Sequence, residues 1–371
     1  MTDLVKPLNA AGSLTNTRAQ SGPTGPCDSV PSYSNELASI PERTRRVLAS
    51  FWSLPEATCV VPQGVATRIA TQRPATSTVL SARIRAHAGG PPAFLKILRR
   101  PVNYASEYQG LVSAHTVSSS SMRVRVPAIL HTVEADRALL LEYVPGTRLT
   151  SWLRRNYLAL PRWCEQAVRD LGRWLAAYHE RRHYFDRPHE FVAGHHQLVG
   201  RYLDDAAAVG RLAADQHAKA HRVLEAVLAT IARQPVRLTW CHGDFALNNL
   251  IAYDEKLYII DFTRYGKGPP EADLVCFWNS LRKEIGPFPF SSVARQTLWS
   301  ALVEAYEEAS AVKANTGVLD LWVLADLAYE LAYAPRLGRL SFSWLRRSRL
   351  CAQTASYLRC WLDEHARASR V

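Results

Sequence analysis

Three polar side chains lie close together in one part of the chain and are of the types that can handle a phosphate group. The stretch Cys241-His-Gly-Asp-Phe-Ala-Leu-Asn-Asn-Leu250 contains a carboxylate at Asp244 and an amide at Asn249, and a second carboxylate follows at Asp261. Magnesium prefers oxygen ligands and usually takes one or two carboxylates, leaving positions for phosphate and water. The segment predicts that Asn249 and Asp261 hold magnesium, while Asp244 accepts a hydrogen bond from an attacking hydroxyl.

Two apolar runs flank this segment and predict the strands that position it. They are Val236-Arg-Leu-Thr-Trp240 and Lys256-Leu-Tyr-Ile-Ile260. Short apolar runs of this kind are typical of buried strands. Polar residues at strand ends and in the loop between strands are where catalytic groups often lie on a rigid scaffold.

The spacing of these residues resembles that of a known family. Asn249 follows Asp244 by five residues and Asp261 follows by twelve more, which is similar to the catalytic loop and Asp-Phe-Gly segment of protein kinases. Here Gly243 replaces the usual Arg, and Asp-Phe-Thr replaces Asp-Phe-Gly. The pattern His-Gly-Asp-x4-Asn with Ile-Asp-Phe resembles the aminoglycoside phosphotransferase and choline-kinase branch of the protein-kinase-like superfamily. That resemblance implies an α+β, two-lobed fold, with a small antiparallel-sheet N-lobe and a larger, mainly helical C-lobe.

The same resemblance assigns supporting roles to two further residues. The segment Pro269-Pro-Glu-Ala-Asp-Leu274 is similar to the family segment in which an Asp-Leu pair opens a helix. Asp273 would therefore brace the catalytic loop through hydrogen bonds, and His242 would pack and hydrogen-bond beside the catalytic aspartate. Both are expected to be structural supports.

A kinase-like site also needs a lysine that binds the nucleotide phosphates and a glutamate that holds this lysine. The apolar run Pro92–Leu98 contains Lys96, and Glu107 follows at the start of an expected helix. An ammonium in an apolar run needs a partner, because burying an unpaired charge is costly. The open alternatives are that Lys96 lies on an edge strand facing solvent and that Glu134 takes the place of Glu107.

The nucleotide base and its phosphates have less specific signals. The run Arg137–Leu149 reads as a buried strand ended by Pro145-Gly146, and the family resemblance implies that the backbone of Glu142 and Val144 faces the adenine. No side chain there specifies ATP over GTP. Region 65–85 predicts two strands joined by Gln72–Thr78, which contains no glycine, so the phosphate-loop contacts stay unassigned.

A chain of 371 residues is long for one core, which favours two domains. We predict a disordered segment over 1–40, a nucleotide-binding N-lobe over 41–145 that opens with a helix from Pro41 to Trp52, and a catalytic and substrate-binding C-lobe over 146–371. The larger lobe is expected to be mostly helical, since apolar residues recur at three- and four-residue steps. One stripe consists of Val168, Leu171, Leu175 and Tyr178, and further helices are expected at about 217–233, 292–312, 317–334 and 342–366.

Composition indicates a cytoplasmic protein. Seven scattered cysteines without a Cys-x-x-Cys pair argue against a disulfide framework or a zinc knuckle, and favour a reducing compartment. The first residues lack the pattern of a secretory signal, and no apolar run approaches the roughly 18 residues of a membrane span. The oligomeric state cannot be derived from these features.

The sequence predicts an ATP-dependent phosphotransferase that acts on a hydroxyl of a small molecule, with ATP (GTP being open) and Mg2+ as cofactors. The acceptor classes considered are a sugar, an aminoglycoside-like compound, an amino alcohol, and a lipid or glycan precursor. The net charge of +12 favours anionic partners and somewhat disfavours a polycationic acceptor. Two alternatives remain: a catalytically weak pseudokinase scaffold, and a basic nucleic-acid-binding protein, although no nucleic-acid module is recognisable.

Several histidines and acids are weaker candidates. His217 and His221 lie on one face of an expected helix, but the Glu of a zinc-protease motif is missing, so metal binding is not expected there. A second group is expected in a loop that is solvated or faces the substrate: His183, His189, His195 and His196. Acids that could line an acceptor pocket are Asp186, Glu190, Asp204 and Asp205.

Overall fold

The structure is a computed structural model that describes residues 42–50, 79–84, 92–98, 100–117, 123–156, 160–181, 183–186, 188–284, 289–333 and 342–368. The segment 1–40 and the expected turn Gln72–Thr78 lie outside the described residues. The predicted helix at Pro41–Trp52 is described as a helix over 42–50. Of the two strands expected in 65–85, the second is described.

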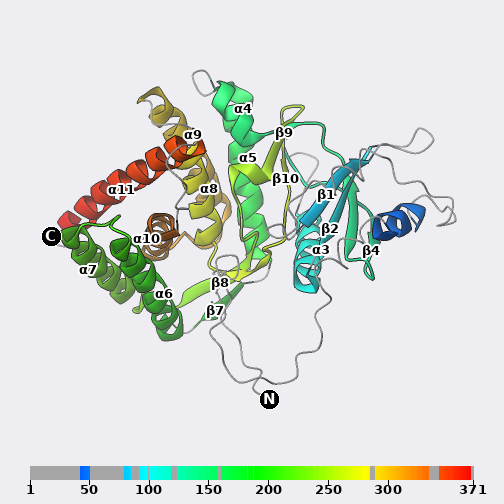
Figure 1. Cartoon of the computed structure of the whole chain (residues 1–371). Coiled ribbons are helices and arrows are strands. Elements are labelled where there is room, and N and C mark those ends of the chain that lie inside the picture. Colours follow the sequence, from blue (N-terminus) through cyan, green and yellow to red (C-terminus); the bar gives the residue numbers. More distant parts are fainter. Residues whose placement is uncertain are drawn as a thin grey trace, which may run out of the picture.

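One antiparallel sheet forms the smaller lobe, at the right of Figure 1. Its strand order is β1 (Val79–Ile84), β2 (Ala93–Leu98), β5 (Ala138–Glu142) and β4 (Ile129–Val133). Helix α3 (Pro101–His115) follows β2 and begins with a proline in its first turn, where a missing N–H costs nothing. The run Ala138–Leu141 is buried throughout, because β5 is an inner strand of the sheet.

A second sheet contains the predicted strand at 256–260 and part of the segment that precedes it. Its order is β3 (Val124–Arg125), β10 (Lys256–Ile259), β9 (Leu250–Tyr253) and β6 (Thr147–Arg148). Strands β9 and β10 form a hairpin whose two turn residues, Asp254 and Glu255, both have φ near +50°. Positive φ at both central residues matches the right-handed twist of the paired strands. The strand at 256–260 was predicted, whereas β9 was not.

Among the described residues, a third sheet and eight α-helices complete the larger lobe. The sheet order is β11 (Gly266–Gly268), β8 (Val236–Cys241) and β7 (His183–Asp186), and β8 is the other predicted strand. The helices are α4 (Leu149–Asn156), α5 (Arg162–Glu180), α6 (Pro188–Ala208), α7 (Ala214–Ile231), α8 (Glu271–Glu284), α9 (Pro289–Ala309), α10 (Thr316–Tyr333) and α11 (Phe342–Ala368). The fold is therefore α+β with two lobes, as predicted, and the boundary between residues 145 and 146 stays a prediction.

The prediction that four histidines lie in a loop was wrong. His183 begins β7, and His189, His195 and His196 lie on α6. Helix α6 starts at Pro188 and buries the apolar residues Phe191, Val199, Tyr202, Leu203 and Ala206. These positions recur at helical spacing, but the histidines interrupt the stripe in the sequence and hid it.

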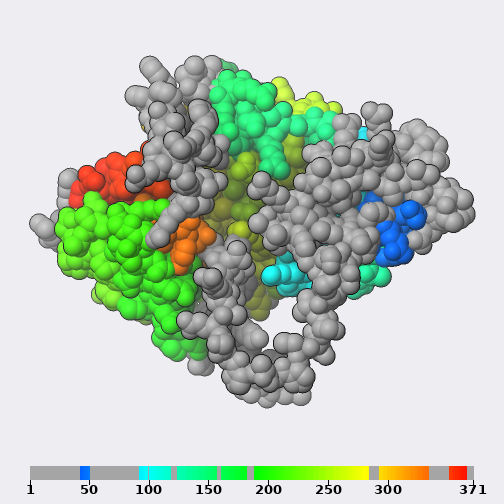
Figure 2. Space-filling model, viewed as in Figure 1, coloured from blue at the N-terminus to red at the C-terminus, as the bar shows by residue number. Residues whose placement is uncertain are grey.

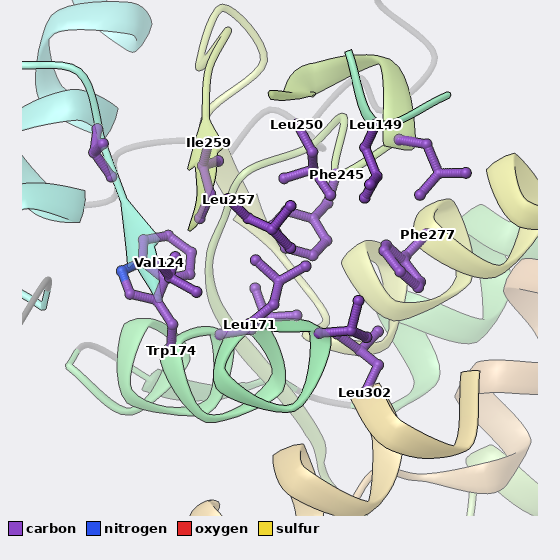
Figure 3. Packing of buried hydrophobic residues seen from close by; sticks show 14 of the residues in the cluster. Val124, Leu149, Leu171, Trp174, Phe245, Leu250, Leu257, Ile259, Phe277 and Leu302 are labelled. Atoms are coloured by element: carbon purple, nitrogen blue, oxygen red, sulfur yellow. The ribbon is translucent and has the colours of Figure 1, made fainter. Parts of the chain in front are cut away.

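Two hydrophobic cores hold the helices. The larger lobe presents α6 and α7 (green) on one side of the molecule, with α11 (red) above them (Figure 2). Residues of α6, α7, α10 and α11 share one core, while a second core joins α5, α8 and α9 to the sheets of both lobes. In the second core, Phe245 lies among Leu149, Leu250 and Leu257 (Figure 3). This packing fixes the loop that contains Asp244.

No helix among the described residues combines the length and apolar character needed to cross a membrane.

Candidate active site

The segment with Asp244 leaves the end of β8 and returns to the second sheet at β9. Between them, a short 3-10 helix, η3 (Leu247–Asn249), carries the predicted metal ligand Asn249. Phe245 and Leu247 are fully buried on either side of Ala246, while Asp244 is half-buried. The two apolar anchors hold a loop whose polar side chains remain accessible.

Gly243 has a conformation and a neighbour that exclude any side chain. Its φ is +78°, a value that favours glycine because a Cβ would meet the following carbonyl. A Cβ added here would lie 2.2 Å from the carbonyl oxygen of Arg264. Glycine in place of the kinase Arg thus lets the loop lie directly against the segment that follows Asp261.

Asp273, at the start of α8, binds the backbone of this loop. Its Oδ2 accepts from the amide of His242 at 2.7 Å, and its Oδ1 accepts from the amide of Gly243 at 2.9 Å. The Nε2 of His179, on α5, lies 3.2 Å from Oδ2. Burial acts to raise the pKa of Asp273, but the hydrogen bond and charge of His179 outweigh it, so the pKa is lowered and the carboxylate stays ionised.

His242 links the loop to the strand before Asp261. Its Nε2 donates to the carbonyl oxygen of Ile260 at 3.1 Å, and its Nδ1 accepts from the amide of Asp244 at 3.3 Å. These two bonds suit one neutral tautomer. Burial lowers the pKa of His242, which keeps the ring in that neutral form. Its ring also contacts that of Phe262, with centroids 4.5 Å apart.

Asn249 is held in place from inside the loop. Its Nδ2 donates to the backbone carbonyl oxygen of Asp244 at 2.8 Å, and the backbone carbonyl oxygen of Asn249 accepts from the amide of Ile260 at 2.9 Å. Since the side-chain nitrogen is engaged, the side-chain oxygen is the atom that can face a cation.

The buried pair Lys96 and Glu107 and the partly exposed Asp261 form one charge cluster between the lobes. The Nζ of Lys96 lies 2.7 Å from Oε1 of Glu107 and 2.9 Å from Oδ1 of Asp261. Lys96 is therefore inward-facing on β2, and Glu107 is its partner on α3. Burial works to lower the pKa of Lys96, but the two carboxylates outweigh it and the pKa is raised. The lysine remains charged.

The pKa values of the two carboxyl groups in this cluster are shifted in opposite directions. Burial raises the pKa of Glu107 to about 7, although Lys96 opposes this. Burial also acts to raise the pKa of Asp261, but Lys96 and the hydroxyl of Thr263 hold it at about 2. Thr263 Oγ1 donates to Asp261 Oδ1 at 2.8 Å. Asp261 has φ of +69°, a costly conformation for a residue with a side chain.

A close contact between helix α3 and Phe262 holds the cluster together. A Cβ added at Gly110 would lie 2.6 Å from the Cβ of Phe262. Glycine at this position lets α3 approach the segment after Asp261, which brings the Lys96–Glu107 pair close to Asp261.

Glu142 and Val144, whose backbone is predicted to face the adenine, lie where the first sheet ends. Glu142 is the last residue of β5 and is exposed, with its amide donating to the carbonyl oxygen of Ala128 at 2.8 Å. Val144 is buried two residues later. The amide of Glu142 is thus used within the lobe, and contact of this segment with a base stays a prediction.

Sequence reasoning missed His179, Thr263 and Cys276. His179 lies next to the predicted apolar stripe of α5, yet its partner Asp273 is 94 residues away. The Sγ of Cys276, on α8, lies 4.0 Å from Oδ1 of Asp244. The Thr in place of the kinase Gly after Asp261-Phe262 was the one local signal, because a hydroxyl two residues after a carboxylate can hydrogen-bond to it.

Comparison with known proteins places the chain in a family. Residues 71–312 match the model of the phosphotransferase enzyme family, and the chain belongs to that family. No curated protein sequence matches it. The structure is similar to that of glucosamine kinase in complex with glucosamine, ADP and inorganic phosphate, with a TM-score of 0.57 and 16% identity over 80% of this chain and 84% of that chain. Another crystal form of glucosamine kinase gives a TM-score of 0.57 and 17% identity over 79% and 82% of the two chains.

Proposed function

We propose that this member of the phosphotransferase enzyme family transfers the γ-phosphoryl group of ATP to a hydroxyl of a small molecule. The observation that carries the proposal is the position of Lys96, whose Nζ lies within 2.9 Å of both Glu107 and Asp261. Asp261 is 165 residues from Lys96 in sequence. A cation held between a sheet residue, a helix residue and the segment after the catalytic loop is the arrangement that kinase chemistry needs.

Lys96 would bind the α- and β-phosphates of the nucleotide. Its charge is secured by Glu107 on one side, so it can turn toward phosphate oxygens without losing its partner. The backbone of Glu142 and Val144 would face the base. A lysine that stays protonated supplies a fixed positive charge near the phosphates, which stabilises the charge that develops during transfer.

Asp244 would orient the acceptor hydroxyl. The hydroxyl oxygen forms a bond to the γ-phosphorus while the bond to the bridging β–γ oxygen breaks, leaving ADP, and the hydroxyl proton passes to Asp244. The backbone on both sides of Asp244 is fixed by Asp273 and Asn249 through bonds of 2.7–2.9 Å. Such fixation supports the role because catalysis by alignment loses much of its effect when a group moves by about 1 Å.

The residues present fit a magnesium ion. Asp261 offers an ionised carboxylate whose side chain is 37% exposed, and Asn249 offers a neutral oxygen. One carboxylate and one amide suit Mg2+, which keeps positions for phosphate and water. Asp261 and Asn249 would hold the ion, and bound Mg2+ would supply neutralisation of the phosphate charge.

The test is a phosphate-transfer screen with a blank variant. Hydroxyl compounds (sugars, amino sugars, amino alcohols and aminoglycosides) are incubated with labelled ATP and Mg2+, and transfer is measured for the wild type and Asp244→Asn. We expect Asp244→Asn to bind nucleotide normally but to lower turnover by roughly 10²–10⁴, the usual contribution of a positioned base. Asp254→Asn, in the exposed β9–β10 turn, is the matched control and should leave turnover unchanged.

Two outcomes would overturn the proposal. Turnover of Asp244→Asn near that of the wild type would remove Asp244 from its role. Nucleotide binding with no transfer to any acceptor and no Asp244-dependent hydrolysis of ATP would instead favour the scaffold alternative.

A further inference from the structure

Two histidines of α7 and one aspartate of α6 converge on the surface, away from the cluster around Lys96. The Nε2 of His217 lies 2.8 Å from Oδ1 of Asp204, and the Nε2 of His221 lies 3.0 Å from the same oxygen. The two Nε2 atoms are 3.1 Å apart. Three potential metal-binding atoms from two helices therefore form one small triangle.

The packing of α6 against α7 builds this triangle. The two helices are neighbours and bury their apolar faces in one core. His217 and His221 are one turn apart on α7, so their rings lie on the same face. Gly200, one turn before Asp204, lies beside the ring of His221, where a Cβ would make an ordinary van der Waals contact of 3.7 Å with Cε1. The sequence alone gave the two histidines; the structure adds the third group.

The triangle has the dimensions of a metal-ligand set. At a metal–ligand distance of about 2.05 Å, neighbouring ligand atoms are about 2.9 Å apart in an octahedron and about 3.3 Å apart in a tetrahedron. The observed edges of 3.0 and 3.1 Å lie within this interval, and the edge of 2.8 Å lies just below its octahedral end. Both imidazoles direct Nε2 toward one oxygen, so their in-plane directions converge. An ion about 2.05 Å from all three atoms would lie roughly 1.1 Å from their plane.

We propose that Asp204, His217 and His221 form a binding site for a divalent transition-metal ion, with Zn2+ as the expected occupant. Two imidazole nitrogens and one carboxylate suit zinc, whereas Mg2+ and Ca2+ prefer oxygen ligands alone. The three side chains are between 31% and 62% exposed, so the remaining coordination positions face solvent. Bound zinc would join α6 to α7 and stabilise this pair of helices. The site is independent of the proposed phosphotransfer.

A second cluster in the described part of the chain has similar chemistry but a different role. His179, Cys241 and Asp273 lie close together, yet Asp273 already accepts two backbone amides of the catalytic loop. Burial raises the pKa of the Cys241 thiol well above its usual value, which disfavours the thiolate that binds metal. The surface triangle is the better zinc site, and the variants below separate the two.

The test is a zinc titration by calorimetry in the presence of excess Mg2+, with His217→Ala, His221→Ala and Asp204→Asn. The matched control is His196→Ala, because His196 pairs with Glu225 at 2.6 Å across the same two helices without a second imidazole. We expect the wild type to bind one zinc per chain. In each site variant the zinc affinity should fall by more than roughly 10- to 100-fold or be lost, because even groups that only support metal ligands usually contribute that much. His196→Ala should bind as the wild type does.

Two further measurements make the result specific. Co2+ in place of zinc should give a visible absorption band in the wild type and in His196→Ala that is absent from the three site variants. Zinc should also raise the thermal midpoint of the wild type and leave that of His217→Ala unchanged, with circular dichroism confirming that each variant is folded. Absence of saturable zinc binding in the wild type would overturn the proposal. So would wild-type binding in all three site variants, because zinc would then lie elsewhere.

Discussion

Replacing Asp273 by Asn tests whether the catalytic loop is held by one buried carboxylate. The carboxylate is completely buried and accepts from the amides of His242 and Gly243, with His179 on the same side as His242. Asn has almost the same shape but only one oxygen. In either orientation of its amide, the NH2 group therefore points at a backbone N–H that previously had an acceptor.

The expected magnitude follows from this mismatch. A hydrogen bond to a charged group contributes about 1.5–3 kcal/mol, and a buried donor without an acceptor costs about 1–3 kcal/mol. These two figures overlap, because both count the same lost contact. We expect Asp273→Asn to lower the free energy of unfolding by about 2–4 kcal/mol. Displacement of Asp244 by about 1 Å would lower turnover by roughly 10².

Urea unfolding measures the first effect and phosphate transfer to an identified acceptor measures the second. Asp170→Asn is the matched control: Asp170 is also buried and accepts from a backbone amide, that of Arg123 at 3.1 Å, but it does not contact the loop. That variant should lose stability and keep its turnover. An Asp273→Asn protein with the wild-type urea midpoint, or with wild-type turnover, would refute the reasoning.

Two further predictions concern the same region. Gly243→Ala should lower the free energy of unfolding by more than about 2 kcal/mol, because φ of +78° costs about 1–2 kcal/mol and the new Cβ meets the carbonyl oxygen of Arg264 at 2.2 Å. Scanning calorimetry measures this loss. The control is Gly194→Ala on α6, where a Cβ meets nothing within 4 Å, and this variant should keep or raise the thermal midpoint. Burial opposes ionisation of Asp261, but Lys96 holds the pKa of Asp261 at about 2, below the ordinary 3.8. The ionised carboxylate therefore contributes fully to stability above pH 3.8, and this contribution is lost as the pH falls toward 2. The difference in urea midpoint between the wild type and Asp261→Asn should shrink over that window, and a constant difference would contradict the assignment.

The sequence predicted those features that depend on local spacing. The helix with the stripe Val168, Leu171, Leu175 and Tyr178 is α5, and those four residues are buried. The other expected helices agree with α7, α9, α10 and α11 within three residues at each end. Strand β9 was missed because its turn, Asp254-Glu255, lacks the glycine that usually marks positive φ.

The sequence did not reveal the contacts between distant segments. Lys96 was predicted with Glu107, but its second contact, with Asp261 at 2.9 Å, depends on the approach of α3 to Phe262 at Gly110. Likewise, neither His179 nor Asp204 has a local pattern that marks it. Each acquires its partners through helix packing, and no spacing rule extends over the 94 residues between His179 and Asp273.

The local charge of the site changes what the overall charge implies about the acceptor. The chain as a whole carries +12, which suggested that a polycationic acceptor is disfavoured. The candidate site instead combines one ammonium, Lys96, with the carboxylates of Glu107, Asp244, Asp261 and Asp273. A bound nucleotide would add further negative charge, which the Mg2+ proposed at Asn249 and Asp261 would partly neutralise. Exposed charges are screened beyond roughly 8–10 Å at physiological ionic strength, whereas buried ones are screened much less. We therefore expect the acids beside Asp244 to influence the choice of acceptor more than the net charge does, and amine-bearing alcohols belong in the screen on equal terms with neutral sugars.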